Sequence, residues 1–312
     1  MSLDAAGASG SMNAIHLDTH SLSPVQRAHQ SIWAANSRTG VRYVETEAVC
    51  FRVRESGTGQ HTIVLFADGP NTLEHHDPIF ERLALWARVI VVDPPGFGFS
   101  TPGPDFDFSL FAFTQAYTQL LLALGIKGAV LCPTCTNVYP CALIAARDPE
   151  LVSHLVLMQA LAWREERIWV RKIVDPTGDL ASPYLGQDLI YRTRAAAAAN
   201  WYPNALGDTG RAAAFLHQAR GCFDNGANFC LASLIQAWFG LDKDAPEFPS
   251  FTQPTLAIWG LSDRSHRKSD RSSLLLIAPH ATMAEREGVG HFPEIEDPEW
   301  FERTLKSFLG VE

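Results

Sequence analysis

The chain has 312 residues, of which 46% are hydrophobic and 19% are charged, which suits one large globular domain or one domain with an insertion. Its formal net charge of −9 argues against a nucleic-acid partner. No apolar run reaches the roughly 18 residues of a membrane span, and the polar start lacks the regions of a secretory signal. Six cysteines are too few and too scattered for a disulfide scaffold. We therefore expect a reduced, cytoplasmic setting.

Short apolar runs alternate with amphipathic segments in the first half of the chain. After a flexible tail at residues 1–22, a capped helix is predicted up to Ala35 and a hairpin over residues 42–54. Buried strands are predicted at 62–66, 88–92, from Gly128, and at 151–158, with helices at 78–86, 108–124 and 138–147. Repeated alternation of strand and helix predicts a parallel sheet covered by helices on both faces.

The alternation stops in the segment 162–250, which is rich in Trp, Arg and Ala and contains helix-like pieces but no good strand. It resumes with a strand at 255–259, a helix at 267–277, a strand at 281–285 and a helix at 298–309. The prediction is therefore one α/β core, residues 23–161 and 251–312, that carries an inserted helical cap at 162–250.

The turn that follows Gly128–Pro133 carries the residue best placed for chemistry. A nucleophile at a strand-to-helix turn stands at the carboxyl edge of the sheet, where backbone N–H groups point at the same spot. Cys135 occupies that place, with Thr134 as the competing hydroxyl. A thiol suits the position because a helix N-terminus and a histidine partner favour the reactive thiolate. The alternative is a buried cysteine that packs as a small hydrophobe.

Four motifs in this order resemble the α/β-hydrolase fold superfamily, in particular its lidded members such as meta-cleavage-product hydrolases and proline iminopeptidases. They are Ala67–Pro70, Asp93–Ser100, Pro133–Asn137, and the pair Trp259–Asp263 with Gly290–Pro293. The family's nucleophile commonly lies 14 residues before the Pro of a His-Pro-Glu. Counting back from Pro149 of Asp-Pro-Glu here gives Cys135.

The resemblance implies a catalytic triad. His291 would be the general base toward Cys135 and the acid toward the leaving group, and Asp263 would orient the imidazole. Asp263 is also placed to cap the helix predicted to follow it. The oxyanion hole would consist of the backbone N–H groups of Gly69 and Thr136, because Pro70 has no N–H to offer.

Several residues depart from the family pattern. Asp68 puts a carboxylate beside the developing oxyanion, which it would oppose, so we expect it to cap a turn or to recognise a substrate amine. Ala67 replaces the usual histidine of this loop. Pro133 and Asn137 stand where the tight elbow calls for small residues, and Asn tolerates left-handed geometry better than most residues.

Two further patterns have a functional and an ordinary interpretation. Cys132 and Cys135 form a C-x-x-C, the spacing of a thioredoxin-like redox pair, but it leaves the hydrolase motifs unexplained and has too few ligands for zinc. Arg164, Arg167 and Arg171 share a helix face, which is either solvated or a handle for an anionic or pantetheine-like substrate.

We expect an enzyme that attacks an ester or thioester of a small to medium apolar organic acid through Cys135, and passes the acyl group to water or another nucleophile. Asp68, Trp163 and Phe292 are the predicted substrate contacts. No cofactor or metal is predicted, and the expected partner is a small acyl substrate, free or linked to a carrier or CoA; a homodimer is compatible with the sequence. The alternatives are a protein of the same fold that binds an apolar ligand without turnover, and a catalyst of a non-hydrolytic step in which His291 shuttles a proton.

Overall fold

A computed structural model describes residues 14, 15, 17, 18, 34, 36–240 and 246–312. Nearly all of the helix predicted before Ala35 therefore lies outside the described residues. Ala14 and Ile15, in the segment expected to be a flexible tail, are buried, and the hydroxyl of Ser233 donates a hydrogen bond to Asp18. None of the helices in the described residues combines the length and the apolar composition of a membrane span.

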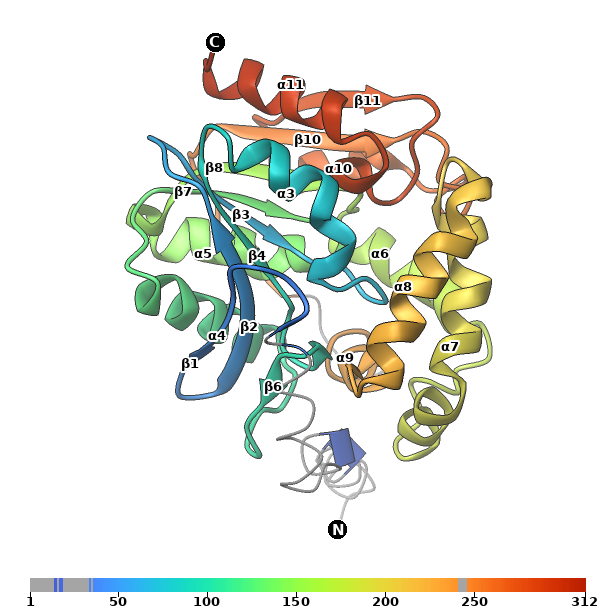
Figure 1. Cartoon of the computed structure of the whole chain (residues 1–312). Coiled ribbons are helices and arrows are strands. Elements are labelled where there is room, and N and C mark those ends of the chain that lie inside the picture. The colour runs from blue at the N-terminus through green and yellow to red at the C-terminus, as the bar shows by residue number, and fades with distance from the viewer. Residues whose placement is uncertain (1–13, 16, 19–33, 35, 241–245) are drawn as a thin grey trace.

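The central sheet is mostly parallel, as predicted (Figure 1). Its order is β1-β2-β4-β3-β7-β8-β10-β11, with β6 paired to β2. Strands β1 and β2 pair antiparallel at one edge, and every pairing from β4 to β11 is parallel. The strands are β1 (Val41–Glu45), β2 (Val49–Ser56), β3 (Thr62–Phe66), β4 (Arg88–Val92), β6 (Thr101–Pro102), β7 (Ala129–Pro133), β8 (Val152–Met158), β10 (Thr255–Gly260) and β11 (Thr282–Arg286).

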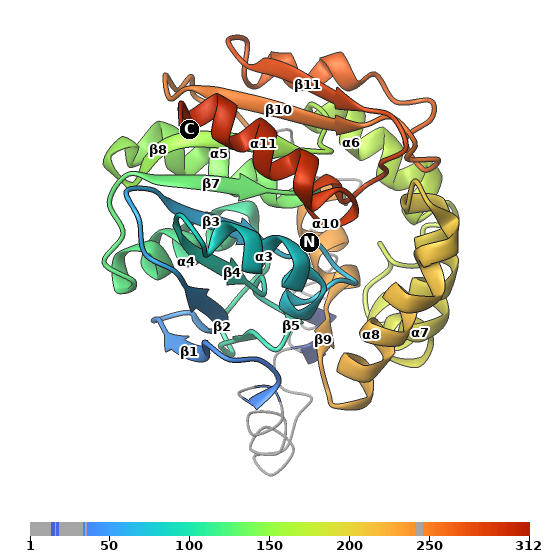
Figure 2. The same ribbon diagram turned by 45° about the horizontal axis from the view of Figure 1, so that its top comes forward.

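Helices cover both faces of this sheet because the strands are apolar on both sides (Figure 2). In β3, Val64 and Phe66 belong to one buried cluster and Ile63 and Leu65 to the other. Helices α4 (Leu110–Ala123) and α5 (Val138–Arg147) pack on the first side, and α3 (Asp77–Leu83) and α11 (Pro298–Leu309) on the second.

Helix α11 illustrates how sequence sets these boundaries. The Asp297 side chain accepts the N–H of Trp300 at its start, Gly310 takes a left-handed conformation at its end, and Phe301 and Leu305 bury its apolar face. The predicted helix at 267–277 is instead the short 3-10 helix η6 (Arg271–Leu276), because Asp270 accepts both the N–H and the hydroxyl of Ser272.

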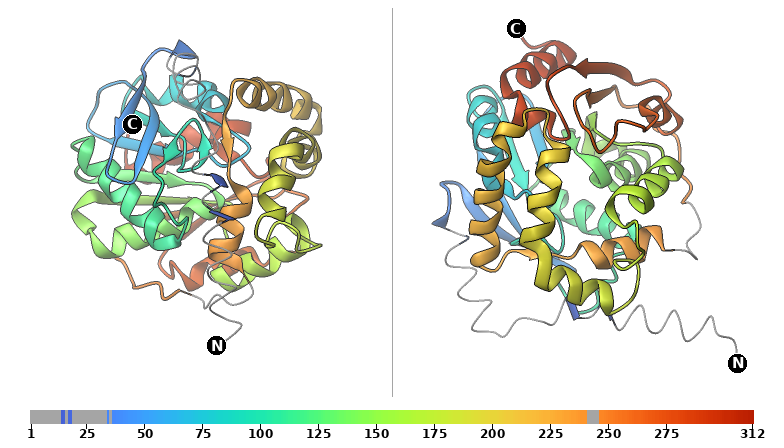
Figure 3. Two further views of the ribbon diagram at one scale, coloured as in Figure 1. Left: turned by 90° about the horizontal axis from the view of Figure 1, so that it is seen from below. Right: turned by 90° about the vertical axis from the view of Figure 1, so that its right-hand side faces the viewer.

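The segment between β8 and β10 forms the cap, and Figure 3 shows its two long helices side by side. It contains α6 (Trp163–Trp169), the π-helix η4 (Val170–Val174), α7 (Leu185–Ala205), α8 (Ala212–Asp224) and α9 (Leu231–Phe239). Contrary to the expectation that the cap contains no strand, β9 (Asn228–Phe229) pairs antiparallel with β5 (Phe97–Gly98) of the core. This ribbon and the polar contacts described below fix the cap over the carboxyl edge of the sheet.

The remaining short elements connect the longer helices and strands. They are η1 (Leu73–His76), η2 (Cys135–Asn137), η3 (Pro149–Leu151), η5 (Thr209–Arg211) and α10 (Pro293–Glu296).

Candidate active site

Cys135 lies on the sharp turn between β7 and α5. Its φ of 55° is in the left-handed region, which side-chain-bearing residues rarely adopt and which is typical of strained functional turns. Asn137, expected to crowd the turn, has an ordinary helical φ of −63°. Its amide nitrogen lies 3.3 Å from the carbonyl oxygens of Ala67 and Thr134, and its amide oxygen accepts the hydroxyl of Tyr117. Asn137 therefore braces the elbow.

The elbow presents the thiol and turns the neighbouring hydroxyl away. Cys135 lines the pocket under the cap, whereas Thr134 does not. The hydroxyl of Thr134 instead donates to Glu294, at 3.3 Å. Cys132 belongs to β7 and is fully buried in the core on the side covered by α3 and α11, and both it and Cys135 are free thiols.

The structure brings His291 and Asp263 together with Cys135. Nδ1 of His291 lies 2.7 Å from Asp263 Oδ2, and side-chain atoms of His291, Cys135 and Asp68 all lie within 4.8 Å of one another. Asp263 also accepts the N–H and hydroxyl of Ser265, so it caps the turn as well, and Gln159 donates to it at 3.0 Å. The acid and the imidazole are therefore held in one orientation.

The His291 loop is tied to the cap. The backbone N–H of His291 donates to the carbonyl of Ala205 at the end of α7, at 2.8 Å. Glu296 accepts three N–H groups, from Gly290 and Phe292 on either side of His291 and from Gly207 in the cap. Burial raises the pKa of Glu296 to about 7, although these hydrogen bonds lower it.

Asp68 faces the imidazole. Its Oδ2 is 3.4 Å from Nε2 of His291, so it lies against His291 and lines the pocket, rather than capping a turn as one expectation had it. The pKa of Asp68 is raised by burial, and His291 offsets part of that effect. Gly69 and Thr136, the predicted oxyanion donors, line the same pocket.

Glu166 is a further carboxylate that the sequence reasoning missed. It comes from α6 of the cap, is fully buried, and its Oε1 lies 3.9 Å from Sγ of Cys135. Burial raises its pKa to about 7. The only sequence signal was its place in the polar Arg-Glu-Glu-Arg run at the start of the cap, which also fits a solvated helix.

Burial and the nearby carboxylates favour the protonated forms of both Cys135 and His291. Burial, followed by the charges of Asp68 and Glu166, raises the pKa of the Cys135 thiol far above its ordinary range. Burial opposes protonation of His291, but the carboxylates of Asp263 and Asp68 outweigh it and raise its pKa well above 6.5. The resting site therefore holds a neutral thiol beside an imidazolium.

Aromatic rings enclose the imidazole and exclude water. Trp201 meets the His291 ring edge-on with centroids 5.2 Å apart, and His266 stacks on it at 5.3 Å. Trp169 stacks in turn on His266, at 4.3 Å. Burial lowers the pKa of His266 to about 3, so this second histidine is neutral. His266 therefore packs between the rings of Trp169 and His291 and does not line the pocket.

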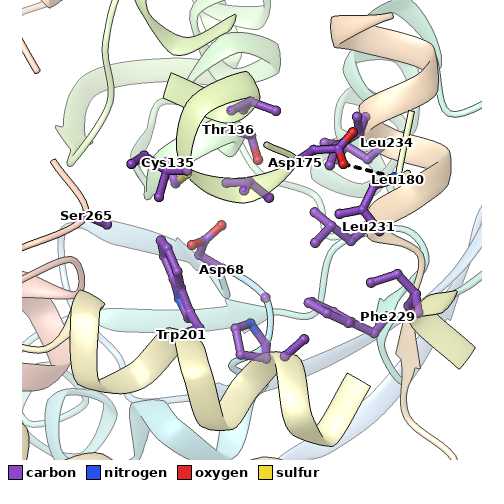
Figure 4. A pocket seen from close by; sticks show the side chains of 18 of the residues that line it. Asp68, Cys135, Thr136, Asp175, Leu180, Trp201, Phe229, Leu231, Leu234 and Ser265 are labelled. Atoms are coloured by element: carbon purple, nitrogen blue, oxygen red, sulfur yellow. Dashed lines mark hydrogen bonds between the residues drawn. The ribbon is translucent and has the colours of Figure 1, made fainter. Parts of the chain in front are cut away.

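The pocket between core and cap has a volume of about 620 Å³ and opens next to Cys135 (Figure 4). Beyond Asp68 and Trp201 its wall is mainly apolar, with Phe229, Leu231 and Leu234 at the end away from the thiol. Lys172 and Arg264 are the cationic side chains that line it in the described part of the chain.

Two predicted substrate contacts lie elsewhere. Trp163 does not line the pocket, because it packs against Tyr139, Trp238 and Phe239 in an aromatic cluster. Phe292 is fully buried behind the pocket wall against Phe215. Both side chains pack in the protein interior and do not line the pocket.

The predicted face of three arginines is divided between two environments. Arg164 and Arg171 are exposed, and Arg167 donates to the carbonyl of Gly240.

Comparison with known proteins gives one family and a common fold. A model of the α/β hydrolase fold family matches residues 66–298. A search of curated sequences finds no match. Solved structures with this fold include a putative α/β hydrolase from Nostoc sp. PCC 7120, which has 18% identity and a TM-score of 0.70 over 86% of this chain and 97% of that one.

Two others have named activities. A putative epoxide hydrolase from Klebsiella pneumoniae has 19% identity and a TM-score of 0.69 over 89% of this chain and 99% of that one. A loop variant of haloalkane dehalogenase from Bradyrhizobium elkanii has 17% identity and a TM-score of 0.67 over 86% of this chain and 96% of that one. At these identities the solved structures establish the fold, and the family match covers most of the chain. The chain therefore belongs to the α/β hydrolase fold family.

Proposed function

We propose that this protein is a hydrolase or acyltransferase that uses Cys135 as its nucleophile, His291 as its base and Asp263 as the group that orients the base. The observation that carries the proposal is the strained elbow that presents Cys135 to the pocket under the cap, beside an imidazole whose Nδ1 is 2.7 Å from a buried carboxylate.

The reaction has two covalent steps. Sγ of Cys135 attacks the substrate carbonyl carbon and its proton passes to Nε2 of His291, while the N–H groups of Gly69 and Thr136 bind the oxyanion. His291 then protonates the departing alcohol or thiol, leaving a thioester on Cys135. Water or another acceptor loses its proton to His291 as it attacks that thioester, and the returning proton restores the thiol.

The charges around the thiol set the conditions for this chemistry. His291 accepts the thiol proton only when Nε2 is unprotonated, and Asp263 and Asp68 favour its protonated form. Catalysis by this route should therefore be faster on the alkaline side of neutrality.

The pocket supports the substrate class. A volume of about 620 Å³ and an apolar far end suit an acyl group of small to medium size. Lys172 is compatible with an anionic or carrier-linked leaving group, which remains a prediction, as do the cytoplasmic location and the homodimer.

A second candidate is a non-hydrolytic proton transfer by His291 and Asp68. The observation that favours this second function is the 3.4 Å distance between Asp68 Oδ2 and Nε2 of His291. A hydrolase would leave this nitrogen free for the nucleophile. Substitution of Cys135 would then leave activity intact, while His291→Ala would remove it. A protein that only binds a ligand would show no turnover in the wild type or in either variant.

Mass spectrometry separates these functions. Wild type, Cys135→Ala and His291→Ala are incubated with acyl thioesters and aryl esters of four to eight carbons, and the intact mass and product release are followed. An acyl adduct on Cys135 that depends on His291 supports the proposal. Turnover by Cys135→Ala without any adduct refutes it in favour of the non-hydrolytic function.

A further inference from the structure

Four potential metal ligands lie close together at the wall of the pocket, where Asp68 and Cys135 line it and His291 and Glu166 lie behind them. Sγ of Cys135, a ring nitrogen of His291 and a carboxylate oxygen of Asp68 lie within 4.8 Å of one another, and all three residues are buried. Oε1 of Glu166 is 3.9 Å from the same sulfur. The four come from separate elements: the elbow, the loop after β11, the loop after β3, and helix α6 of the cap.

The spacing approaches that of a tetrahedral zinc site. Zinc bonds of about 2.0 Å to nitrogen or oxygen and 2.3 Å to sulfur separate neighbouring ligand atoms by roughly 3.3–3.8 Å. Asp68 Oδ2 and His291 Nε2 are 3.4 Å apart, and Cys135 and Glu166 are 3.9 Å apart. The ligand atoms of Cys135, His291 and Asp68 lie up to 4.8 Å apart, which exceeds a tetrahedral edge by about 1 Å; rotation of these side chains and of Glu166 can supply the difference.

Two of these groups carry buried atoms that lack a hydrogen bond. They are Nε2 of His291, whose ion-pair partner Asp68 Oδ2 is as far as 3.4 Å away, and Oε2 of Glu166, and neither has a hydrogen-bond partner among the described residues. Buried polar atoms are rarely left in this state unless a ligand or ion meets them. A cation between them would satisfy both.

The surroundings resemble the outer shell of a metal centre. A histidine that binds zinc usually donates its other ring N–H to a carboxylate, and Asp263 accepts from Nδ1 of His291 at 2.7 Å. Asp263 is itself held by Ser265 and Gln159. The imidazole is therefore already oriented with Nε2 toward the cluster.

Charge points to a cation. Asp68, Glu166 and Asp263 place three carboxylates around one imidazole. The positive charges that act most strongly on Asp68, Glu166 and Cys135 belong to histidines, not to Arg or Lys. A divalent ion would balance this excess, and a set of sulfur, nitrogen and oxygen ligands suits zinc better than magnesium or calcium.

We propose that Cys135, His291 and Asp68 bind one zinc ion, with Glu166 as the fourth ligand. Zinc displaces the proton of the Cys135 thiol and binds Nε2 of His291 in its unprotonated form, and the released protons go to solvent. The metal thereby occupies both the nucleophile and the base, so zinc inhibits acyl transfer reversibly. This inhibition rests on the proposed function, whereas zinc binding does not.

Metal titration tests the site directly. Full-length protein is stripped with a chelator and titrated with zinc chloride against a chromogenic zinc indicator. We expect one zinc per chain, with affinity at least about 100-fold lower in Cys135→Ala and about 10- to 100-fold lower in Asp68→Asn. Cys50→Ser and Glu165→Gln, which change a thiol and a carboxylate outside the cluster, should bind as wild type does.

Cobalt gives an independent readout. Cobalt bound at the same site should produce a near-ultraviolet thiolate-to-metal absorption band that Cys50→Ser keeps and Cys135→Ala loses. If a variant fails to fold, zinc protection of Cys135 from iodoacetamide in the wild type replaces that comparison. Absence of saturable binding at about 1 mM zinc, or equal affinity in wild type, Cys135→Ala and Asp68→Asn, would overturn the proposal.

An activity measurement keeps the two proposals separate. Zinc should suppress formation of the acyl adduct with the midpoint found for binding, and a chelator should restore it. Zinc binding without any adduct in the stripped protein rejects the acyl-transfer function and leaves the metal site standing. Adduct formation that zinc does not affect, with no binding, rejects the metal site alone.

Discussion

Glu166→Gln should make Cys135 more reactive. The Glu166 carboxylate lies 3.9 Å from the Cys135 sulfur and opposes the thiolate. At that distance two unit charges interact by about 4 kcal/mol at an effective dielectric constant of 20, which corresponds to about 3 pKa units. With a pKa of about 7, Glu166 is only about half ionised at neutral pH. Glu166 is fully ionised at the higher pH where the thiol titrates, so we expect the substitution to lower the pKa of Cys135 by about 3 units, with a smaller effect on the thiolate population near pH 7.

The assay is the pH dependence of alkylation at Cys135. Iodoacetamide labelling is followed by peptide mass analysis from pH 6 to 10. Labelling of Cys135 in the variant should accelerate by about 2-fold near pH 7, where about half of the Glu166 side chains are neutral, and by about 100-fold near pH 9, where Glu166 is ionised. Glu165→Gln removes the adjacent carboxylate, which is only partly buried, and should leave the rate unchanged. An unchanged or slower rate in Glu166→Gln would refute the view that this carboxylate acts on the thiol through its charge.

Three other outcomes follow from the same contacts. Asp263→Asn should lower kcat/KM for an aryl ester by about 100-fold or more with little change in KM, because the Nδ1–H of His291 loses its anionic partner; Asp270→Asn is the control. The midpoint of the acidic limb of the pH profile of kcat/KM should lie above pH 6.5, because the pKa of His291 is raised. Asp68→Asn should move this limb to lower pH, and a limb that does not move would contradict the pairing of Asp68 with His291. Glu296 has a pKa of about 7 in the folded protein against an ordinary 4.5, so its contribution to stability is complete below pH 4.5 and is lost as pH rises through 7. The free energy of urea unfolding of the wild type should therefore fall by up to about 3 kcal/mol over this range relative to that of Glu296→Gln. Parallel pH dependences of the two proteins would contradict this.

The sequence predicted those parts of the fold that depend on local pattern. Continuous apolar runs such as Thr62–Phe66 and Arg88–Val92 are buried strands because both faces of a parallel sheet are covered. Helix α11 begins and ends as predicted, because its capping residues and its apolar spacing agree. The prediction for the segment 267–277 was wrong because side-chain hydrogen bonds from Asp270 compete with helical ones.

Site residues were predictable to the extent that motif position determines where a side chain points. Cys135, His291 and Asp263 meet at the sheet edge because each follows a parallel strand. For residues of the cap, no motif position predicts where a side chain points. Trp163 and Glu166 are three positions apart on α6, yet the first packs into an aromatic cluster and the second reaches the thiol, and only tertiary packing decides between them.

The departures at the elbow and in the oxyanion loop are physically connected. A serine hydroxyl is a much weaker acid than a thiol, so the negative field of Asp68 and Glu166 would leave a serine in place of Cys135 with almost no access to its nucleophilic form. Cysteine starts from an ordinary pKa near 8.5 and has more room to absorb the same field. Under the proposed mechanism Asp68 and Cys135 therefore belong together, because a carboxylate beside the base is tolerated only when the nucleophile is sulfur. Changing the nucleophile alone, in Cys135→Ser with Asp68 retained, should abolish adduct formation. Cys135→Ser combined with Asp68→Gly should recover part of it. If the double variant is as inactive as the single one, the two departures from the family pattern are independent of each other.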